Sequence, residues 1–268
     1  MIPFLKIEAT GNDFIVFDSR TLSLKRLTPS VIRRLCHRHL GIGADGVIFV
    51  GVQENSPLRM FYFNADGSAG EMCGNGLRAA ARYAREEGLF PAASKPVIEA
   101  QDGLHAVRFN KDGTISVEIL VSTGQGAQPD LSRLPLPENV HLLGFLNSGV
   151  PHLILQSEEA VEHLPLAEFA PALRHHPVFP AGTNVDVIQR LSANRVRVRT
   201  YERGVEAETL SCGTGVTAAA LLLWQYDKSL PEELLMETRG GVLKVSRQRG
   251  RIVLTGPATL VFAGKIHL

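Results

Sequence analysis

Two cysteines, Cys73 and Cys212, lie in short segments of the same form, Cys-Gly-x-Gly. Each segment is followed by an alanine-containing run that favours a helix. We therefore expect each thiol just before or at a helix N-terminus, where the first backbone N–H groups carry partial positive charge. A thiol in this position has a pKa below its usual value of about 8.5, and a carboxylate can bind the same N–H groups.

The two cysteine segments belong to an internal repeat. Residues 71–81 resemble residues 210–220, at an offset of 139. At the same offset residues 43–45 match 182–184 and 62–64 match 201–203, and residues 11–15 match 149–153 one position out of step. Four matches in one order predict two similar halves related by a pseudo-two-fold axis. The two thiols would then face each other as an acid/base pair, which suits inversion of a stereocentre lying between them.

Other interpretations of these residues stay open at this point. A structural or redox disulfide is one alternative for the two cysteines, whereas zinc is disfavoured because no Cys-x2-Cys or paired-histidine spacing accompanies them. Cys36 is most simply a small buried hydrophobic residue. Neither cysteine segment extends to the Gly-x-Gly-x-x-Gly pattern of a dinucleotide-binding site, and neither matches a phosphate-binding loop. Taken alone, Glu202 and Arg203 are either a surface ion pair or part of a cleft.

The composition predicts an ordinary globular protein. The chain has 268 residues, of which 44% are hydrophobic, and 28 Lys and Arg balance 27 Asp and Glu, so we expect no nucleic-acid partner.

The apolar run 216–224 is far shorter than the roughly 20 residues that span a bilayer, and residues 1–6 lack a signal-peptide pattern. We expect no membrane association. Three cysteines make no disulfide framework, and we expect a cytoplasmic protein.

Short apolar and β-branched runs predict many strands, separated by turn signals such as Asp112-Gly113 and Gly240-Gly241. Helices are expected at residues 28–38, 77–87, 164–173 and 216–226. The last of these is almost wholly apolar, so it should be buried on all sides. Residues 123–137 are typical of a linker. The mixture indicates sheets wrapped around buried helices.

The chain resembles the diaminopimelate epimerase family. The matching motifs follow the family's order over most of the chain and lie at residues 11–14, 41–46, 63–68, 72–76, 151–152, 182–184, 201–204 and 208–215. The resemblance implies interconversion of LL- and meso-2,6-diaminoheptanedioate in lysine biosynthesis, with two cysteines and with no pyridoxal phosphate, other cofactor or metal. One departure is Val150, where many members have Asn before Pro-His, so that one side-chain contact to the substrate is missing.

The resemblance also implies a role for each matching site residue. Cys73 and Cys212 would be the acid/base thiols, and His152 and Glu202 would adjust their pKa values. The carboxylate at the reacting carbon would be held by Gly74, Asn75, Gly213 and Thr214. The rest of the small amino-acid substrate would be held by Asn12, Asn64, Asn184, Glu202 and Arg203, with Arg203 on the distal carboxylate and Glu202 near an amino group.

The implied fold is α/β (α+β), with two pseudo-symmetric halves that each curl a mostly antiparallel sheet around a central helix. We expect residues 1–120 with about 257–268 to form the half carrying Cys73, residues 121–256 to form the half carrying Cys212, and a homodimer. A racemase of another amino acid on the same scaffold is the near alternative. A non-enzymatic amino-acid-binding or thiol-redox protein is the alternative from another class. Arg203 favours diaminopimelate because a second carboxylate needs a cationic partner.

Overall fold

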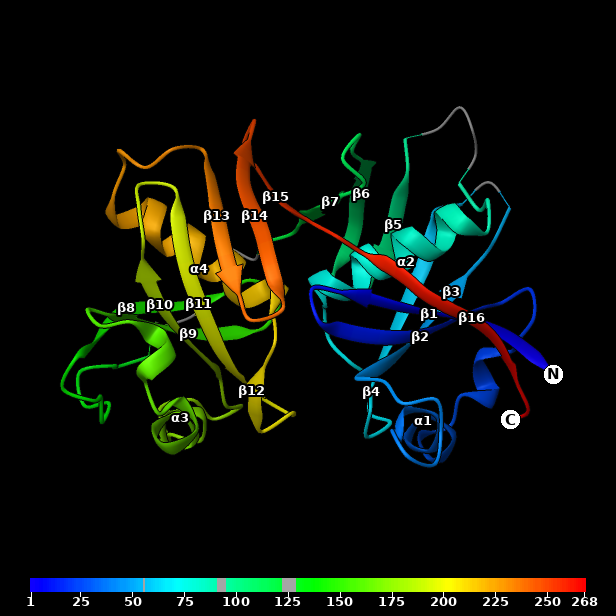
Figure 1. Ribbon diagram of the computed structural model, residues 1–268, viewed down its shortest axis with the longest axis horizontal. Coiled ribbons are helices and arrows are strands. Elements are labelled where there is room, and N and C mark those ends of the chain that lie inside the picture. The colour runs from blue at the N-terminus through cyan, green and yellow to red at the C-terminus, as the bar shows by residue number, and fades with distance from the viewer. Residues whose placement is uncertain (55, 91–94, 122–128) are drawn as a thin grey trace. The chain divides into compact units, whose positions relative to one another are not determined.

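The computed structural model describes residues 1–54, 56–90, 95–121 and 129–268. The chain divides into two compact units, residues 1–118 with 255–268 and residues 119–254 (Figure 1). Within the described ranges, each unit combines one mostly antiparallel sheet with two α-helices, which confirms the predicted fold class. The predicted linker begins in residues that lie outside the described ranges.

The first unit has the strand order β16-β1-β2-β3-β4-β5-β6-β7. Its β2/β3 and β4/β5 pairs are parallel, and the other pairs are antiparallel. The strands are β1 (Ile2–Ala9), β2 (Asn12–Asp18), β3 (Gly46–Gly51), β4 (Leu58–Asn64), β5 (Val97–Ala100), β6 (Gly103–Phe109), β7 (Ile115–Ile119) and β16 (Thr259–Ile266). The helices are η1 (Leu24–Arg26), α1 (Pro29–Cys36) and α2 (Gly74–Glu86).

The second unit repeats this topology in the order β8-β9-β10-β11-β13-β14-β15, with β12 paired to β11. Here β9/β10 and β11/β13 are the parallel pairs. The strands are β8 (Val140–Asn147), β9 (Pro151–Ser157), β10 (Asn184–Arg190), β11 (Arg195–Glu202), β12 (Ala207–Thr209), β13 (Glu233–Thr238), β14 (Gly241–Gln248) and β15 (Arg251–Gly256). The helices are η2 (Val161–His163), α3 (Leu166–Arg174) and α4 (Gly213–Tyr226).

The strand register explains why one repeat match is out of step. Phe14 pairs with Gly46 and Leu153 pairs with Val185, so the paired residues of β2/β3 and β9/β10 are 32 positions apart in both units. Ile15 and Val47 face α1 as Leu153 and Val185 face α3, so these strand pairs correspond at an offset of 138, which is the offset of the match that is out of step.

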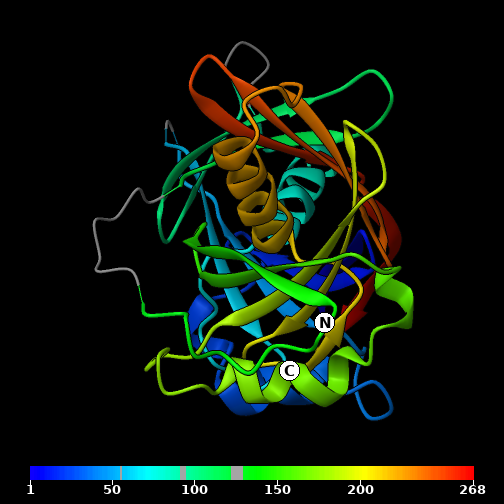
Figure 2. The same ribbon diagram turned by 90° about the vertical axis from the view of Figure 1, so that its left-hand side faces the viewer.

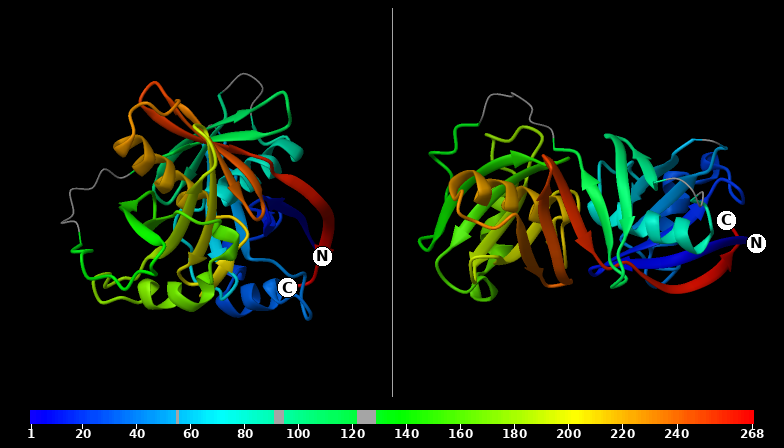
Figure 3. Two further views of the ribbon diagram at one scale, coloured as in Figure 1. Left: turned by 60° about the vertical axis from the view of Figure 1, so that its left-hand side comes forward. Right: turned by 90° about the horizontal axis from the view of Figure 1, so that it is seen from above.

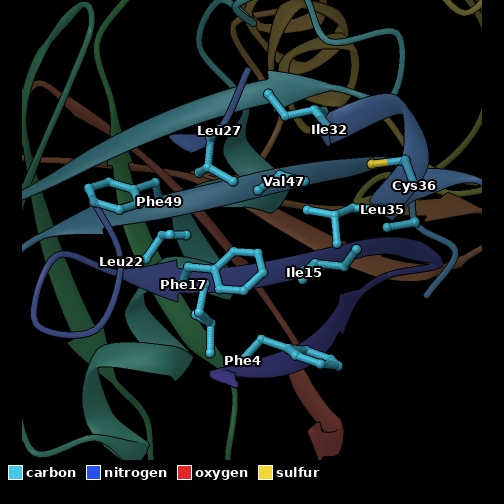
Figure 4. Packing of buried hydrophobic residues seen from close by; sticks show 12 residues of the cluster. Phe4, Ile15, Phe17, Leu22, Leu27, Ile32, Leu35, Cys36, Val47 and Phe49 are labelled. Carbon is cyan, nitrogen blue, oxygen red and sulfur yellow. The ribbon is translucent and has the colours of Figure 1, made fainter. Parts of the chain in front are cut away.

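Side chains alternate between the two faces of each sheet. In the first unit, Ile15, Phe17, Val47 and Phe49 pack with α1 in one apolar cluster (Figure 4). Cys36 belongs to this cluster, and burial raises the pKa of its thiol to about 12, in agreement with its predicted role as a buried hydrophobic residue. The opposite face of the sheet packs against α2, which contacts β1 to β4.

The second unit places α3 and α4 on opposite faces of its sheet in the same way (Figure 2). Leu153, Leu155, Val185 and Val187 pack with α3. The alternate positions of β9 and β10, including His152, face α4. Helix α4 is buried from Gly213 to Trp224 except for half-buried Leu221, as its apolar sequence predicts. Figure 3 shows α2 and α4, each among the strands of its own unit. No helix in the described part of the chain is long and apolar enough to cross a membrane.

Candidate active site

Both cysteines are helix N-caps, as their sequence context predicts. Cys73 precedes α2 and its sulfur accepts a hydrogen bond from the Gly76 N–H at 3.3 Å. Cys212 precedes α4 and its sulfur accepts from the Gly215 N–H at 3.4 Å. In each helix the sulfur binds the third N–H group and the cysteine carbonyl binds the fourth. The cap therefore leaves the first two N–H groups to other acceptors. They belong to Gly74, Asn75, Gly213 and Thr214, the four residues predicted to hold a carboxylate.

Asn12 is the polar side chain beside Cys73. Its Oδ1 lies 4.0 Å from the Cys73 sulfur, and its Nδ2 donates to Asp45 Oδ2 at 2.8 Å. Asp45 also accepts from the Asp13 backbone N–H at 3.1 Å. The Asp45 carboxylate can only accept hydrogen bonds at neutral pH, so it orients the amide of Asn12 with the oxygen toward the thiol.

A charged cluster stabilises this arrangement. The Lys6 side chain is almost fully buried and lies 2.6 Å from Asp13 Oδ2, and Arg38 Nη2 bonds to both Asp13 and Asp45 at 2.9 and 2.7 Å. Burial by itself would raise the pKa of Asp13, but hydrogen bonds from Arg38 and Lys6 outweigh it and lower that pKa to about 2. Asp13 is therefore ionised at neutral pH and fixes the turn that carries Asn12.

Arg78 is a fully buried cation within the first turns of α2. Its guanidinium donates to Asn75 Oδ1 at 2.8 Å, Thr10 Oγ1 at 3.0 Å, and the carbonyls of Gly74 and Pro257, both at 3.3 Å. All four acceptors are neutral. Burial lowers the pKa of Arg78 to about 10, opposed by the negative charges of a Cys73 thiolate and of Glu8. The guanidinium therefore keeps its charge at neutral pH and favours negative charge on Cys73.

The surroundings of Cys212 differ in charge. The side chain is buried, and its sulfur lies 3.3 Å from the Thr214 hydroxyl. Burial, together with the carboxylates of Glu202 and Asp186, raises the pKa of Cys212 well above its usual value. The predicted low pKa is therefore wrong for this thiol, because desolvation and two nearby acids outweigh the helix N-terminus. Cys212 is protonated at neutral pH.

His152 is fully buried beside α4. Its Nε2 lies 2.9 Å from the Thr214 hydroxyl, and its Nδ1 lies 2.6 Å from Asp186 Oδ2. The structure thus connects His152 to Cys212 through Thr214, a contact that agrees with its expected influence on a thiol. Glu202 also acts on Cys212 through its charge, and accepts a hydrogen bond from Thr209 at 2.5 Å.

Asn184 and Arg203 lie together in the same unit. The Arg203 backbone N–H donates to Asn184 Oδ1 at 2.8 Å, and its guanidinium donates to the Ala181 carbonyl at 3.2 Å. In the first unit, Asn64 ends β4, and its Nδ2 donates to the Ser68 hydroxyl at 3.0 Å. The structure thus places Asn12 at Cys73 and places Thr214, His152 and Glu202 around Cys212, with Asn184 beside His152. The assignment of all predicted residues, Asn64 included, to a single site stays a prediction.

A family model described as diaminopimelate epimerase matches residues 4–126 and 144–261. The chain belongs to this family. It is 34% identical over 276 residues to the diaminopimelate epimerase of Aquifex aeolicus (strain VF5), covering 98% of this chain and 97% of that protein. It is 38% identical over 280 residues to the diaminopimelate epimerase of Methanocella arvoryzae (strain DSM 22066 / NBRC 105507 / MRE50), covering 100% of this chain and 97% of that protein.

A solved structure of the phenazine biosynthesis protein PhzF family from Enterococcus faecalis is similar in fold. Its TM-score is 0.72 at 17% sequence identity, and the match covers 100% of this chain and 99% of that one. Among the described residues there is no group of three or more His, Cys, Asp or Glu side chains that could hold a metal ion. That the reaction needs no metal stays a prediction.

Four residues around the cysteines were missed by sequence reasoning. They are Lys6, Asp45, Arg78 and Asp186. Arg78 follows Cys73 by five positions, and at the repeat offset its counterpart is Thr217, which is buried and donates to the Gly213 carbonyl at 2.8 Å. A comparison of the two repeats at this position could have found Arg78. The other three carry no local signal because their partners are distant in the sequence.

Proposed function

We propose that the protein interconverts LL- and meso-2,6-diaminoheptanedioate without a cofactor, with Cys73 and Cys212 as the acid and the base. Membership of the family supports this substrate. The observation that carries the mechanism is the shared capping geometry, in which each sulfur sits at the N-terminus of a buried helix and accepts from its third N–H group. Two such thiols, one on each side of a carbon, can remove and return a proton on opposite faces.

In the proposed reaction, one thiolate removes the proton from the α-carbon. The electron pair of the C–H bond delocalises into the adjacent carboxylate, whose growing charge is stabilised by the first N–H groups of α2 and α4. The second thiol then gives its proton to the opposite face of the carbon, and the configuration inverts. In the reverse direction the two thiols exchange roles.

The charges within the two units favour one resting state. Arg78 places a buried positive charge by Cys73, whereas Cys212 is near two carboxylates and is protonated. We therefore assign the thiolate to Cys73 and the thiol to Cys212 in the resting enzyme. A substrate that needs Cys212 as its base must first have the proton of that thiol removed.

The remaining predicted residues bind the rest of the substrate in this proposal. Arg203 pairs with the distal carboxylate, Glu202 lies near an amino group, and the amides of Asn12, Asn64 and Asn184 complete the contacts. Val150, half-buried in the turn before His152, offers no amide of its own. We also propose that the enzyme acts as a homodimer in the cytoplasm; light scattering coupled to size-exclusion chromatography tests the dimer.

The proposal is tested by incubating dialysed, chelator-treated protein under reducing conditions with a panel of amino acids. We expect conversion of LL- to meso-diaminoheptanedioate at full activity, and no racemisation of proline or glutamate. A racemase of another amino acid would instead convert a different member of the panel. Loss of activity that pyridoxal phosphate or a metal ion restores would contradict the cofactor-independent mechanism.

Mild oxidation is expected to inactivate the enzyme reversibly. Two thiols that flank one carbon can approach each other once the substrate leaves, and a disulfide forms when the Cα atoms come within about 7 Å. Activity should be lost on treatment with an oxidant and should return with dithiothreitol, while bound substrate should protect. The Cys36→Ser variant is the matched control and should behave like the wild type. Inactivation that required Cys36 would contradict the assignment of the two thiols.

A further inference from the structure

Asp186 is a fully buried carboxylate with no role in the mechanism so far. It lies in β10, two residues after Asn184, on the face toward α4. Its two oxygens bind the Thr200 hydroxyl at 2.6 Å and His152 Nδ1 at 2.6 Å. A Cβ atom built on Gly215 would lie 2.3 Å from Asp186 Oδ1, so the carboxylate contacts the first turn of the helix that Cys212 caps.

The hydrogen bonds around His152 assign its tautomer. A carboxylate accepts hydrogen bonds, so the proton of the neutral ring lies on Nδ1, toward Asp186. The Arg203 backbone N–H can only donate, and it faces Asn184 Oδ1 at 2.8 Å, which fixes the orientation of that amide. The Asn184 Nδ2 group therefore faces His152 Nε2, at 3.5 Å, as a donor. Asp186 holds the ring proton on Nδ1, and Asn184 Nδ2 presents a donor to Nε2. Nε2 of His152 is therefore a hydrogen-bond acceptor.

The acceptor on His152 is connected to the thiol by one hydroxyl. Thr214 Oγ1 lies 2.9 Å from His152 Nε2 and 3.3 Å from the Cys212 sulfur. When the hydroxyl donates to the imidazole, its lone pairs can accept from the thiol. When Cys212 is a thiolate and His152 an imidazolium, the same hydroxyl can accept from the ring and donate to the sulfur. A continuous chain thus runs from Asp186 to Cys212 in both states.

We propose, on the basis of the proposed function, that Asp186 is a positioning residue that holds His152 as the proton acceptor for Cys212, with the Thr214 hydroxyl as the relay. The Cys212 S–H proton moves to Thr214 Oγ1 while the Thr214 hydroxyl proton moves to His152 Nε2. The products are a thiolate and an imidazolium that is paired with the Asp186 carboxylate. No proton is lost, and the arrangement is that of an acid-histidine pair that activates a nucleophile.

Among the described residues, the first unit has no equivalent of this hydrogen-bond chain. Ile48 lies at the position equivalent to Asp186, because it lies against Gly76 of α2 as Asp186 lies against Gly215 of α4, and the repeat offset places Asn75 at the position of Thr214. The first half therefore has no acid or hydroxyl at these positions. Glu202, from β11, is the other carboxylate that acts on Cys212, and it is not a member of the relay. Breaking the relay should impair the substrate isomer for which Cys212 is the base, and spare the isomer served by Cys73.

The direct test compares Asp186→Asn with Thr200→Val, which removes the other hydrogen bond to Asp186. Halide elimination from the two α-epimers of a β-halo diaminopimelate analogue needs only one base and reports each thiol separately. We expect Asp186→Asn to slow elimination from one epimer by 10²- to 10⁴-fold, on the order of other acid-histidine pairs, and Thr200→Val, which leaves the Asp186–His152 hydrogen bond in place, to slow either epimer only slightly. An equal loss for both epimers with Asp186→Asn would overturn the proposal. A wild-type enzyme that eliminates halide from neither epimer would instead contradict the proposed function.

If Asp186→Asn does not fold, a second pair of variants tests the same relay. Thr214→Ser keeps the hydroxyl and should change elimination from the two epimers to the same extent, whereas Thr214→Val removes the hydroxyl and should lose the epimer served by Cys212. Iodoacetamide labelling of Cys212 in a Cys73→Ala background needs no substrate. We expect Asp186→Asn to slow this labelling several-fold at pH 7. A carboxylate that acted only by repelling the thiolate would, when removed, speed the labelling, and that result would overturn the proposal.

Discussion

Replacing either active-site cysteine with serine should abolish epimerisation almost completely. A serine hydroxyl preserves the shape of the site but is a very weak base at neutral pH. We expect Cys73→Ser and Cys212→Ser each to lower kcat by at least about a hundredfold, the scale of general acid/base contributions. Cys36→Ser is the matched control, because Cys36 belongs to the apolar cluster beneath α1, and should remain active.

The two serine variants should differ in their stereochemical defect. Each should retain halide elimination from one epimer of a β-halo analogue, and the retained epimer should be opposite in the two variants. This outcome follows because each thiol can reach only one face of the carbon. Fully active Cys212→Ser protein would contradict the two-thiol mechanism. Variants that kept or lost both epimers to the same extent would contradict the assignment of one thiol to each face.

The second large effect is expected for Arg78→Met. Its four neutral acceptors would each lose a buried hydrogen bond, and a typical hydrogen bond contributes about 0.5–1.5 kcal/mol net to stability. We therefore expect the free energy of unfolding to fall by a few kcal/mol. Removal of the positive charge also disfavours the Cys73 thiolate, so iodoacetamide should label Cys73 more slowly at pH 7 in a background that lacks the other two cysteines.

Two further variants separate the charge of Arg78 from its packing. Thr217→Val changes the equivalent position of α4, where one hydroxyl donates to the Gly213 carbonyl, and should cost only about 1 kcal/mol of stability. Arg78→Lys keeps a positive charge with fewer donors, so iodoacetamide should label Cys73 faster in this variant than in Arg78→Met. Equal labelling of Cys73 in the wild type, Arg78→Lys and Arg78→Met would show that the charge has no influence on this thiol.

Local patterns in the sequence were enough to predict the helices. Thr28 caps α1 with Pro29 in its first turn, as the motif indicates. Helices α2 and α4 begin at Gly74 and Gly213, three residues before their predicted starts, because glycines are unfavourable inside helices yet tolerated in the first turn that the cysteine sulfur caps. The capping positions of both thiols could be predicted for the same reason.

Several strands could not be predicted. Pro3 and the buried Lys6 interrupt the apolar residues of β1, and Glu233 and Glu237 flank those of β13, so neither strand is a continuous apolar run. Lys6 is stabilised in the interior by Asp13 of the neighbouring strand, a pairing that only the folded sheet reveals.

The charges around the two thiols also could not be predicted from neighbouring residues in the sequence. The helix N-terminus predicts a low pKa for both thiols, but the pKa of Cys212 is raised by burial and by Glu202 and Asp186, neither of which lies next to it in the chain. Asp186 and His152 are separated by 34 positions, and their contact follows from the parallel pairing of β9 and β10. Residues that act through tertiary contacts therefore require the structure.

The two-base mechanism is tested most directly by epimerisation of LL-diaminoheptanedioate in deuterium oxide, sampled at low conversion. Because one thiol removes the substrate proton and the other delivers a solvent-derived deuteron, the meso product should carry one deuterium at the inverted carbon from the first turnovers. The remaining LL substrate should initially carry none. Deuterium that entered both isomers equally from the start, or a product that retained the original proton, would contradict the mechanism.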